Sequence, residues 1–142
     1  MEPKAFLDLA ANLKDGGNEA SWRTSVSRSY YALLNMTSQF VKPNFPRNFS
    51  GEAKDHDTVH KYLHNCGIED VELVASGLRD LRIERNAADY DLELDRFEGN
   101  HANLMYLKAK VAMQTFEKVT GNADGRRAII NGINSYKQQT NS

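Results

Sequence analysis

Apolar residues recur along this chain at intervals of three and four, the spacing of helices with one buried face. The clearest series lies in a segment that starts near Glu69 and comprises Val71, Val74, Leu78, Leu81, Ala88 and Leu92. The position in this series between Leu81 and Ala88 is residue 85, which is an arginine. An unpaired buried guanidinium is strongly destabilising. The pattern therefore predicts either a partner built for Arg85 or a polar cleft on this face of the helix.

Two helices with clear start and stop signals are predicted before this segment. Pro3 suits the first turn of an N-terminal helix, and the pair Gly16-Gly17 ends it. Asn18 is the predicted N-cap of a long second helix, which is expected to stop before Pro43. Both segments carry apolar residues at helical spacing, so each is expected to bury one face.

Two more helices are expected on either side of the segment that contains Arg85. One covers residues 53–66, and the other covers residues 96–121. Asp95 and Glu98 are expected to form a capping box at the start of the latter. No segment shows the alternation of apolar and polar residues that is typical of a strand.

The chain is therefore predicted to be all-α, a bundle of four main helices plus the N-terminal one. Residues 1–142 are expected to form a single domain without internal repeats or linkers. Within it, residues 122–142 are predicted to be a weakly ordered C-terminal helix or tail, with one short helix around Ala128 to Ile133.

Composition and charge place the chain among soluble globular proteins, with 40% apolar and 26% charged residues. The net charge is −1, from 18 basic and 19 acidic side chains, so any binding of nucleic acid requires a local basic patch. A single cysteine, Cys66, excludes an internal disulfide and suits a reducing compartment. No apolar run reaches the length of a membrane span, and the N-terminus does not resemble a signal peptide. We expect a cytoplasmic protein without contact to a membrane.

The segment "RNAADYD" and the residues before it place several charged and polar side chains on one side of the predicted helix. Arg82, Arg85 and Asp89 fall on neighbouring turns, and Asn86 and Tyr90 form a second pair four residues apart. Guanidinium groups match phosphate oxygens, and a phenol can donate a hydrogen bond or a proton. The segment could therefore bind a phosphodiester. The alternative is structural, with Arg85 and Asp89 neutralising each other and Tyr90 filling the core.

Two other segments carry candidate side chains. In "SRSYYALLNM", Tyr30 and Tyr31 could direct their hydroxyls into a cleft, although ordinary core packing is the alternative, particularly for Tyr30. His56, His60 and His64 follow one another at steps of four, a spacing at which two histidines can ligate zinc. Three such residues drift around the helix and no cysteine accompanies them. A solvated or hydrogen-bonded face is therefore favoured over a metal site.

Taken together, "SRSYYALLNM", "VHKYL" and "RNAADYDLE" resemble motifs of the HEPN superfamily, in the order found in its small bacterial and archaeal members. The resemblance covers about residues 5–119. It implies a helical bundle that forms a homodimer, with the motifs facing a shared cleft. Many HEPN proteins are metal-independent endoribonucleases that act as toxins or in antiviral defence, often with a nucleotidyltransferase-type antitoxin as partner. Others are inactive and bind nucleotide or RNA.

The defining HEPN motif is an arginine, often followed by a polar residue, and then a histidine four to six residues later. Arg85 matches the arginine and Asn86 the polar residue, whereas Tyr90 stands where the histidine would be. A tyrosine with an ordinary pKa of about 10 is a poor proton acceptor near neutral pH. Tyr90 could still protonate a leaving 5′-oxygen, or orient a phosphate, if another group takes the proton of the 2′-hydroxyl.

The resemblance implies a protein that acts on RNA as a metal-independent endoribonuclease, without cofactor or metal. The catalytic residues that it implies are Arg85, Asn86, Asp89 and Tyr90, and the residues expected to bind RNA or nucleotide are Tyr31, His60 and Arg82. Asp89, Asp91 and His60 remain open as proton acceptors. One alternative is a non-catalytic module that binds a nucleotide or a nucleotidyltransferase. The other is a scaffold dimer in which Arg85 and Asp89 form a structural pair.

Overall fold

The computed structural model describes residues 2–141, which form six α-helices and no strand. The helices are α1 (Pro3–Lys14), α2 (Glu19–Asn44), α3 (Lys54–His64), α4 (Glu69–Tyr90), α5 (Gly99–Thr120) and α6 (Ala123–Thr140), with a 3₁₀ turn η1 (Pro46–Asn48) after α2. The predicted all-α bundle is confirmed.

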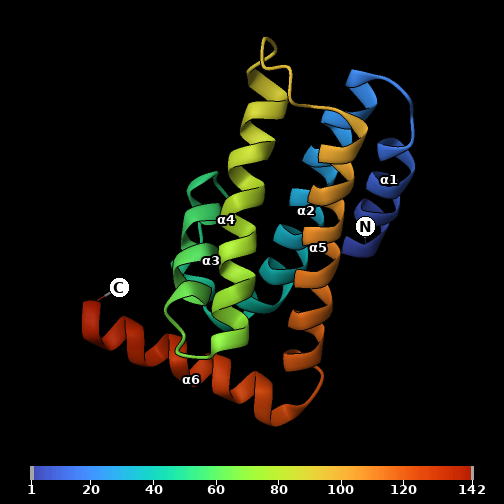
Figure 1. Cartoon of the computed structure of the whole chain (residues 1–142). Helices are drawn as coiled ribbons and strands as arrows, with labels where there is room; N and C mark the ends of the chain where they lie inside the picture. The colour runs from blue at the N-terminus through green and yellow to red at the C-terminus, as the bar shows by residue number, and fades with distance from the viewer. Residues whose placement is uncertain (1, 142) are drawn as a thin grey trace.

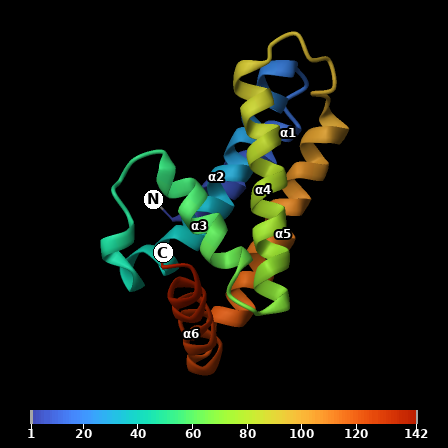
Figure 2. The same cartoon turned by 90° about the vertical axis from the view of Figure 1, so that its left-hand side faces the viewer.

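The three long helices α2, α4 and α5 pack against one another, and α1 covers α2 and α5 (Figure 1). On the other side, α3 packs on α4 and α2, as Figure 2 shows. α6 lies across one end of the bundle, against α3 and α5, and the loop from α4 to α5 lies at the opposite end. The "RNAADYD" segment belongs to the last turns of α4 and therefore lies at the end remote from α6.

The buried stripe of α4 is as predicted along most of its length: Val71, Val74, Leu78, Leu81 and Ala88 are all in the core. The prediction for Leu92 was wrong, because its side chain is 71% exposed. Helix α4 ends at Tyr90, so Leu92 lies in the following loop and no longer follows the helical period. The stripe therefore stops one turn earlier than the sequence suggested.

The sequence predicted some helix ends correctly and others wrongly. Asn18 caps α2 as expected, because its Oδ1 accepts a hydrogen bond from the backbone N–H of Ser21 at 2.9 Å. Pro43 was expected to lie beyond α2 but lies inside its last turn. There the missing N–H removes one bond from a helix that ends one residue later. The capping box was also wrong, because Glu98 is the N-cap of α5 and no side chain bonds to the first turn.

The C-terminal helix α6 is longer than the short segment predicted around Ala128 to Ile133. Asn122 caps it by accepting a hydrogen bond from the N–H of Gly125 at 2.7 Å. Ile129 is buried, and Gly132 packs on the turn that follows α3, where a Cβ would stand 1.8 Å from the carbonyl oxygen of Cys66. This close contact explains why a glycine stands inside α6, although glycine lowers helix propensity.

Candidate functional site

Arg85 has partners on its own helix. Its Nε lies 3.0 Å from Oδ2 of Asp89, and its Nη1 donates a hydrogen bond to Oδ1 of Asn86 at 2.8 Å. The centre of the Tyr31 ring lies 5.1 Å from its Cζ. The side chain keeps 18% of its surface exposed, so it lies at the edge of the bundle and not in a dry interior. The ion pair offered as the structural alternative is thus present, while the guanidinium still reaches solvent.

A second arginine joins this group from α2. Cζ of Arg28 also lies 5.1 Å from the centre of the Tyr31 ring, so the two guanidinium groups share one aromatic ring. Arg28 donates to Oγ of Ser27, which donates in turn to Oδ2 of Asp89, each at 3.3 Å. Asp89 therefore links the two arginines. We call Arg28, Arg82 and Arg85 the arginine cluster, since Arg82 lies one turn before Arg85 on α4.

Tyr90 lies apart from this hydrogen-bond network. Its side chain is 73% exposed, and its ring centre lies 5.6 Å from Cζ of Arg85. Within residues 2–141 its hydroxyl has no hydrogen-bond partner, and Asn86 bonds to Arg85, not to Tyr90. The structural alternative that placed Tyr90 in the core is wrong. An exposed ring beside a guanidinium suits contact with a ligand more than catalysis through a fixed hydroxyl.

Beside the arginine cluster, a cavity of about 230 Å³ lies between α2, α3 and α4. We call it the histidine cavity. Its polar lining comprises Tyr30, His56, Asp57, His60, Arg79 and Arg82, and Leu78 forms an apolar wall. Arg82 forms an ion pair with Asp57, which turns its guanidinium toward α3. The structure thus brings the predicted residues His60 and Arg82 together with the candidate side chains Tyr30 and His56, and adds Asp57 and Arg79.

Tyr30 is fully buried and orients His56. Burial raises the pKa of Tyr30 to about 12, so its hydroxyl keeps the proton. This hydroxyl lies 2.9 Å from Nδ1 of His56 and can donate to it, which leaves the imidazole proton on Nε2. Burial, followed by the charges of Arg82 and Arg85, lowers the pKa of His56 below its usual value. His56 is therefore uncharged at neutral pH.

His60 is also uncharged and lacks a partner. Burial, and next the neighbouring His64 and Arg79, lower its pKa. Its ring stacks on that of His64 with a centroid distance of 5.5 Å, and its Nε2 is buried with no hydrogen-bond partner. A buried polar atom without a partner is uncommon in folded proteins. The histidine cavity thus holds two neutral imidazoles beside two guanidinium groups.

These two histidines make the stability of the fold depend on pH. Their pKa values are lower in the folded state than the ordinary value of about 6.5 in the unfolded chain. Below that pH the unfolded state binds more protons, so the free energy of unfolding falls as the pH is lowered. We expect a lower Tm at about pH 5 than at about pH 7.5.

The double variant His56→Gln, His60→Gln is expected to lose less Tm across the same pH interval. Lys61→Gln, an exposed position on the same helix that does not contribute to the pKa shift of either histidine, is the control and should behave as the wild type does. An equal pH dependence in all three proteins would show that the two cavity histidines do not cause it.

Asp55 fixes the start of α3 and therefore the placement of His56 and Asp57. Its carboxylate accepts hydrogen bonds from the backbone N–H groups of Ser50 at 3.0 Å and Gly51 at 2.7 Å. Lys42 lies 3.4 Å away. These interactions hold the pKa of Asp55 below its usual value, and the hydrogen bond from Ser50 has the largest effect. The loop between α2 and α3 is thus tied to the helix that lines the histidine cavity.

Arg23, which the sequence pattern did not single out, positions the end of α4. Its buried guanidinium donates to five backbone carbonyl oxygens, those of Ala87, Ala88, Asp91, Leu92 and Leu94, at 2.6–3.3 Å. The last carbonyls of a helix have no partner within it, so Arg23 satisfies them from α2. An arginine between the apolar positions Trp22 and Val26 was the available signal, since the same reasoning singled out Arg85.

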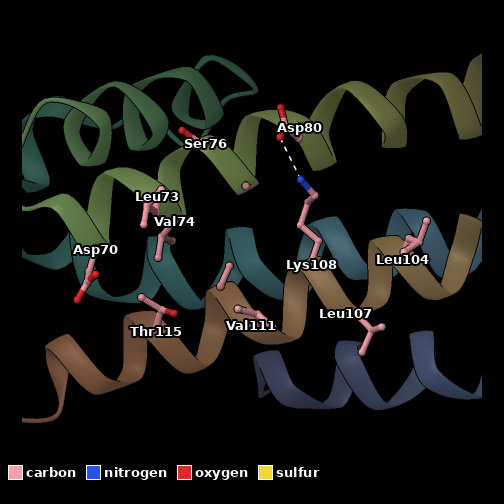
Figure 3. A pocket seen from close by; sticks show the side chains of 12 residues that line it. Asp70, Leu73, Val74, Ser76, Asp80, Leu104, Leu107, Lys108, Val111 and Thr115 are labelled. Carbon is pink, nitrogen blue, oxygen red and sulfur yellow. Dashed lines mark hydrogen bonds and ion pairs between the residues drawn. The ribbon is translucent and has the colours of Figure 1, made fainter.

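A second hollow, between α4 and α5, has a different chemistry (Figure 3). This α4–α5 groove has a volume of about 590 Å³. Four of the eight large apolar side chains that are exposed in the described part of the chain line it: Leu73, Leu104, Leu107 and Val111. Asp80 and Lys108 form an ion pair of 3.1 Å across it, from α4 to α5. Its apolar lining suits contact with another protein more than catalysis.

Other classes of site were not found in the described residues. No three side chains of the metal-ligating types lie close enough together to hold an ion, and no helix is long and apolar enough to cross a membrane. Comparison of this chain with protein-family models, with curated proteins and with solved structures gave no match.

Proposed function

We propose that this protein acts on RNA as a metal-independent endoribonuclease at the surface formed by the arginine cluster and the histidine cavity. The observation that carries the proposal is that three guanidinium groups from two helices adjoin two uncharged imidazoles. The cluster pairs with only two carboxylates, Asp57 and Asp89, so it has an excess positive charge in a chain of net charge −1. Such a patch attracts phosphates.

The reaction requires a 2′-oxygen to attack the adjacent phosphorus, which forms a 2′,3′-cyclic phosphate and releases the 5′-oxygen. Arg85 would stabilise the negative charge of the pentacoordinate phosphate, with Asn86 and Asp89 holding its guanidinium in place. Arg82 and Arg28 would bind neighbouring phosphates. Tyr31 would support the two guanidinium groups that face its ring.

The proton of the 2′-hydroxyl needs an acceptor, and an acceptor is most effective when its pKa lies near the working pH. Of the three candidates, Asp89 is already bonded to Arg85 and Ser27, and Asp91 is exposed in the loop after α4. His60 is uncharged and lines the histidine cavity. We therefore assign His60 as the acceptor. The Nε2–H of His56 would donate a hydrogen bond to the leaving 5′-oxygen, which takes its proton from water.

Tyr90 takes a different role in this proposal from the one that the sequence suggested. Its exposed ring, beside Arg85, can stack on an unpaired base, which favours single-stranded RNA as substrate.

The test is incubation of purified protein with single-stranded RNA in excess EDTA. Products with 2′,3′-cyclic phosphate and 5′-hydroxyl ends support the proposal, because only attack by the 2′-oxygen yields both. An RNA with a single 2′-deoxy nucleotide at the cleaved position is the control and should resist cleavage. Failure to cleave any RNA, together with a rise in Tm on adding nucleotide, would favour the alternative, a non-catalytic module that binds nucleotide or a nucleotidyltransferase. A role as toxin or in antiviral defence rests on the HEPN resemblance.

The proposal includes a homodimer, and the α4–α5 groove is the surface that we assign to it. In a twofold contact the same surface meets itself, so its charges must be complementary to their own copies. Asp80 and Lys108 meet this condition, because each copy would present one carboxylate and one ammonium group to the other. The apolar side chains on both sides of the pair would be removed from water.

The double variant Leu104→Glu, Val111→Glu is therefore expected to be a folded monomer. Both side chains are exposed, so the substitutions should leave the helix content and the core intact while placing like charges in the contact. Sedimentation equilibrium measures the change in mass, and Leu9→Glu, at an exposed apolar position on α1, is the control. A wild type that is already monomeric, or a variant that remains dimeric, would contradict this assignment.

A further inference from the structure

The histidine cavity carries features of a ligand site that do not depend on RNA cleavage. It is set between three helices, and its walls combine cationic, neutral and apolar groups. Its charged side chains are Arg79, Arg82 and Asp57, so the cavity has a net positive charge while both imidazoles are neutral. A positive cavity of this kind favours an anion over a cation or a neutral ligand.

Two imidazole nitrogens of the cavity are left without a partner. Nε2 of His60 is buried and unpartnered. In His56 the hydroxyl of Tyr30 occupies Nδ1, so Nε2 holds the proton and is the nitrogen that remains for a ligand. A group that offers both acceptor oxygens and a hydroxyl would satisfy both nitrogens, because Nε2 of His56 donates and Nε2 of His60 can accept from the hydroxyl of a singly protonated phosphate. The guanidinium of Arg82 could hold one more oxygen. Phosphate has this number of oxygens in a compact group.

The size of the cavity restricts the ligand further. Pockets for whole drug-sized molecules usually have volumes of about 300–1,000 Å³, whereas this cavity has about 230 Å³. A water molecule takes up about 30 Å³ in the liquid, so the cavity has room for a phosphate group and part of a sugar. A nucleobase attached to that sugar would extend outside, toward the arginine cluster.

We propose that the histidine cavity binds a terminal phosphate group, that of a phosphate monoester, through His56, His60 and Arg82. The inference deepens the proposed function, on which the choice of a nucleotide as ligand rests, because it places a phosphate at the two imidazoles. The binding of phosphate itself does not require that the protein cleaves RNA. Two tests therefore separate the two claims.

The first test is calorimetric titration of the full chain with inorganic phosphate, with adenosine 3′-monophosphate and with adenosine. Phosphate and the nucleotide are expected to bind, and adenosine is not. His60→Gln and Arg82→Gln are each expected to bind the nucleotide about tenfold more weakly or worse, since each removes a hydrogen bond to a charged group. Lys61→Gln, which removes a positive charge from an exposed position of the same helix outside the cavity, is the matched control and should bind as the wild type does.

The second test needs no variant and so does not depend on the folding of one. In the wild type, the imidazole resonances of His56 and His60 are expected to move on titration with phosphate, while that of His101, which bonds to Glu84 outside the cavity, stays in place. Movement of the His101 resonance to the same extent, or of none of the three, would overturn the proposal. So would adenosine binding as tightly as its 3′-monophosphate, or unchanged affinity in His60→Gln.

Different results would contradict the phosphate site and the endoribonuclease activity. RNA cleavage that persists while phosphate leaves the His56 and His60 resonances unmoved would overturn the phosphate site and leave the proposed function standing. Phosphate binding with the expected loss in His60→Gln, but no cleavage of any RNA in EDTA, would overturn the endoribonuclease and leave the site standing.

Discussion

Replacing Arg23 by methionine is expected to lower the free energy of unfolding by about 3 kcal/mol. The side chain is buried and is the donor for five carbonyl oxygens at the end of α4 and in the loop that follows. Methionine fills much of the space but donates no hydrogen bond, so these carbonyls lose their shared donor. Urea denaturation followed by circular dichroism measures the change.

The control for this prediction is Arg127→Met. Arg127 is an exposed residue of α6 whose ion pair with Asp124 lies on the surface, and such a substitution usually changes stability by less than about 0.5 kcal/mol. Local opening should accompany the loss in Arg23→Met, with faster hydrogen exchange at the amides of Asp91 and Leu94, which bond within the affected segment. Equal stability of the two variants would show that Arg23 does not hold the end of α4.

Replacing Arg85 by alanine is expected to lower kcat/KM for RNA cleavage by about 10²–10³, the usual effect of removing one donor to the charge of a transition state. Binding of RNA should weaken less, because Arg28 and Arg82 remain in the arginine cluster. The measurement is the initial rate of cleavage of a short single-stranded RNA at concentrations below KM. Arg96→Ala is the control. Arg96 lies in the loop after α4 and forms an ion pair with Glu84 of α4, but it does not belong to the arginine cluster.

The variant Arg85→Met separates this catalytic role from a structural one. If Arg85 serves only to neutralise Asp89, Arg85→Ala and Arg85→Met should both destabilise the protein, because each leaves a partly buried carboxylate without its partner. The double variant Arg85→Met, Asp89→Leu should then restore stability, because apolar replacement of a whole pair is often tolerated. If Arg85 acts on phosphate, Arg85→Met should be as stable as the wild type and as inactive as Arg85→Ala. Full activity in either variant would remove Arg85 from the mechanism.

The features that follow from spacing within one helix could be predicted from the sequence. The core positions Val71, Val74, Leu78 and Leu81 repeat at three and four residues, and the cap at Asn18 depends only on its neighbours. Arg85 and Asp89 could be grouped for the same reason, because helical geometry places residues four apart on one side, and their ion pair was among the expected contacts. The bond from Arg85 to Asn86 was not expected, because Asn86 was predicted to pair with Tyr90.

Contacts between helices could not be predicted in this way. Tyr30 meets His56 over 26 positions, and Arg23 meets carbonyls 64–71 positions away. No periodicity relates such residues, since the packing of whole helices decides which side chains share a space. The end of α4 is an example. Leu92 continues the apolar spacing of the sequence, but it lies in the loop after the helix and is exposed.

The sequence by itself thus determined helices α1 to α5, most of their buried faces and the pairing of Arg85 with Asp89, because hydrogen bonds within a helix and the burial of one face act over a few residues. Only the tertiary structure brought Arg28 to Tyr31, enclosed the histidine cavity and bound Arg23 to the end of α4. These contacts depend on how α2, α3 and α4 pack, which is set by burial of the whole core.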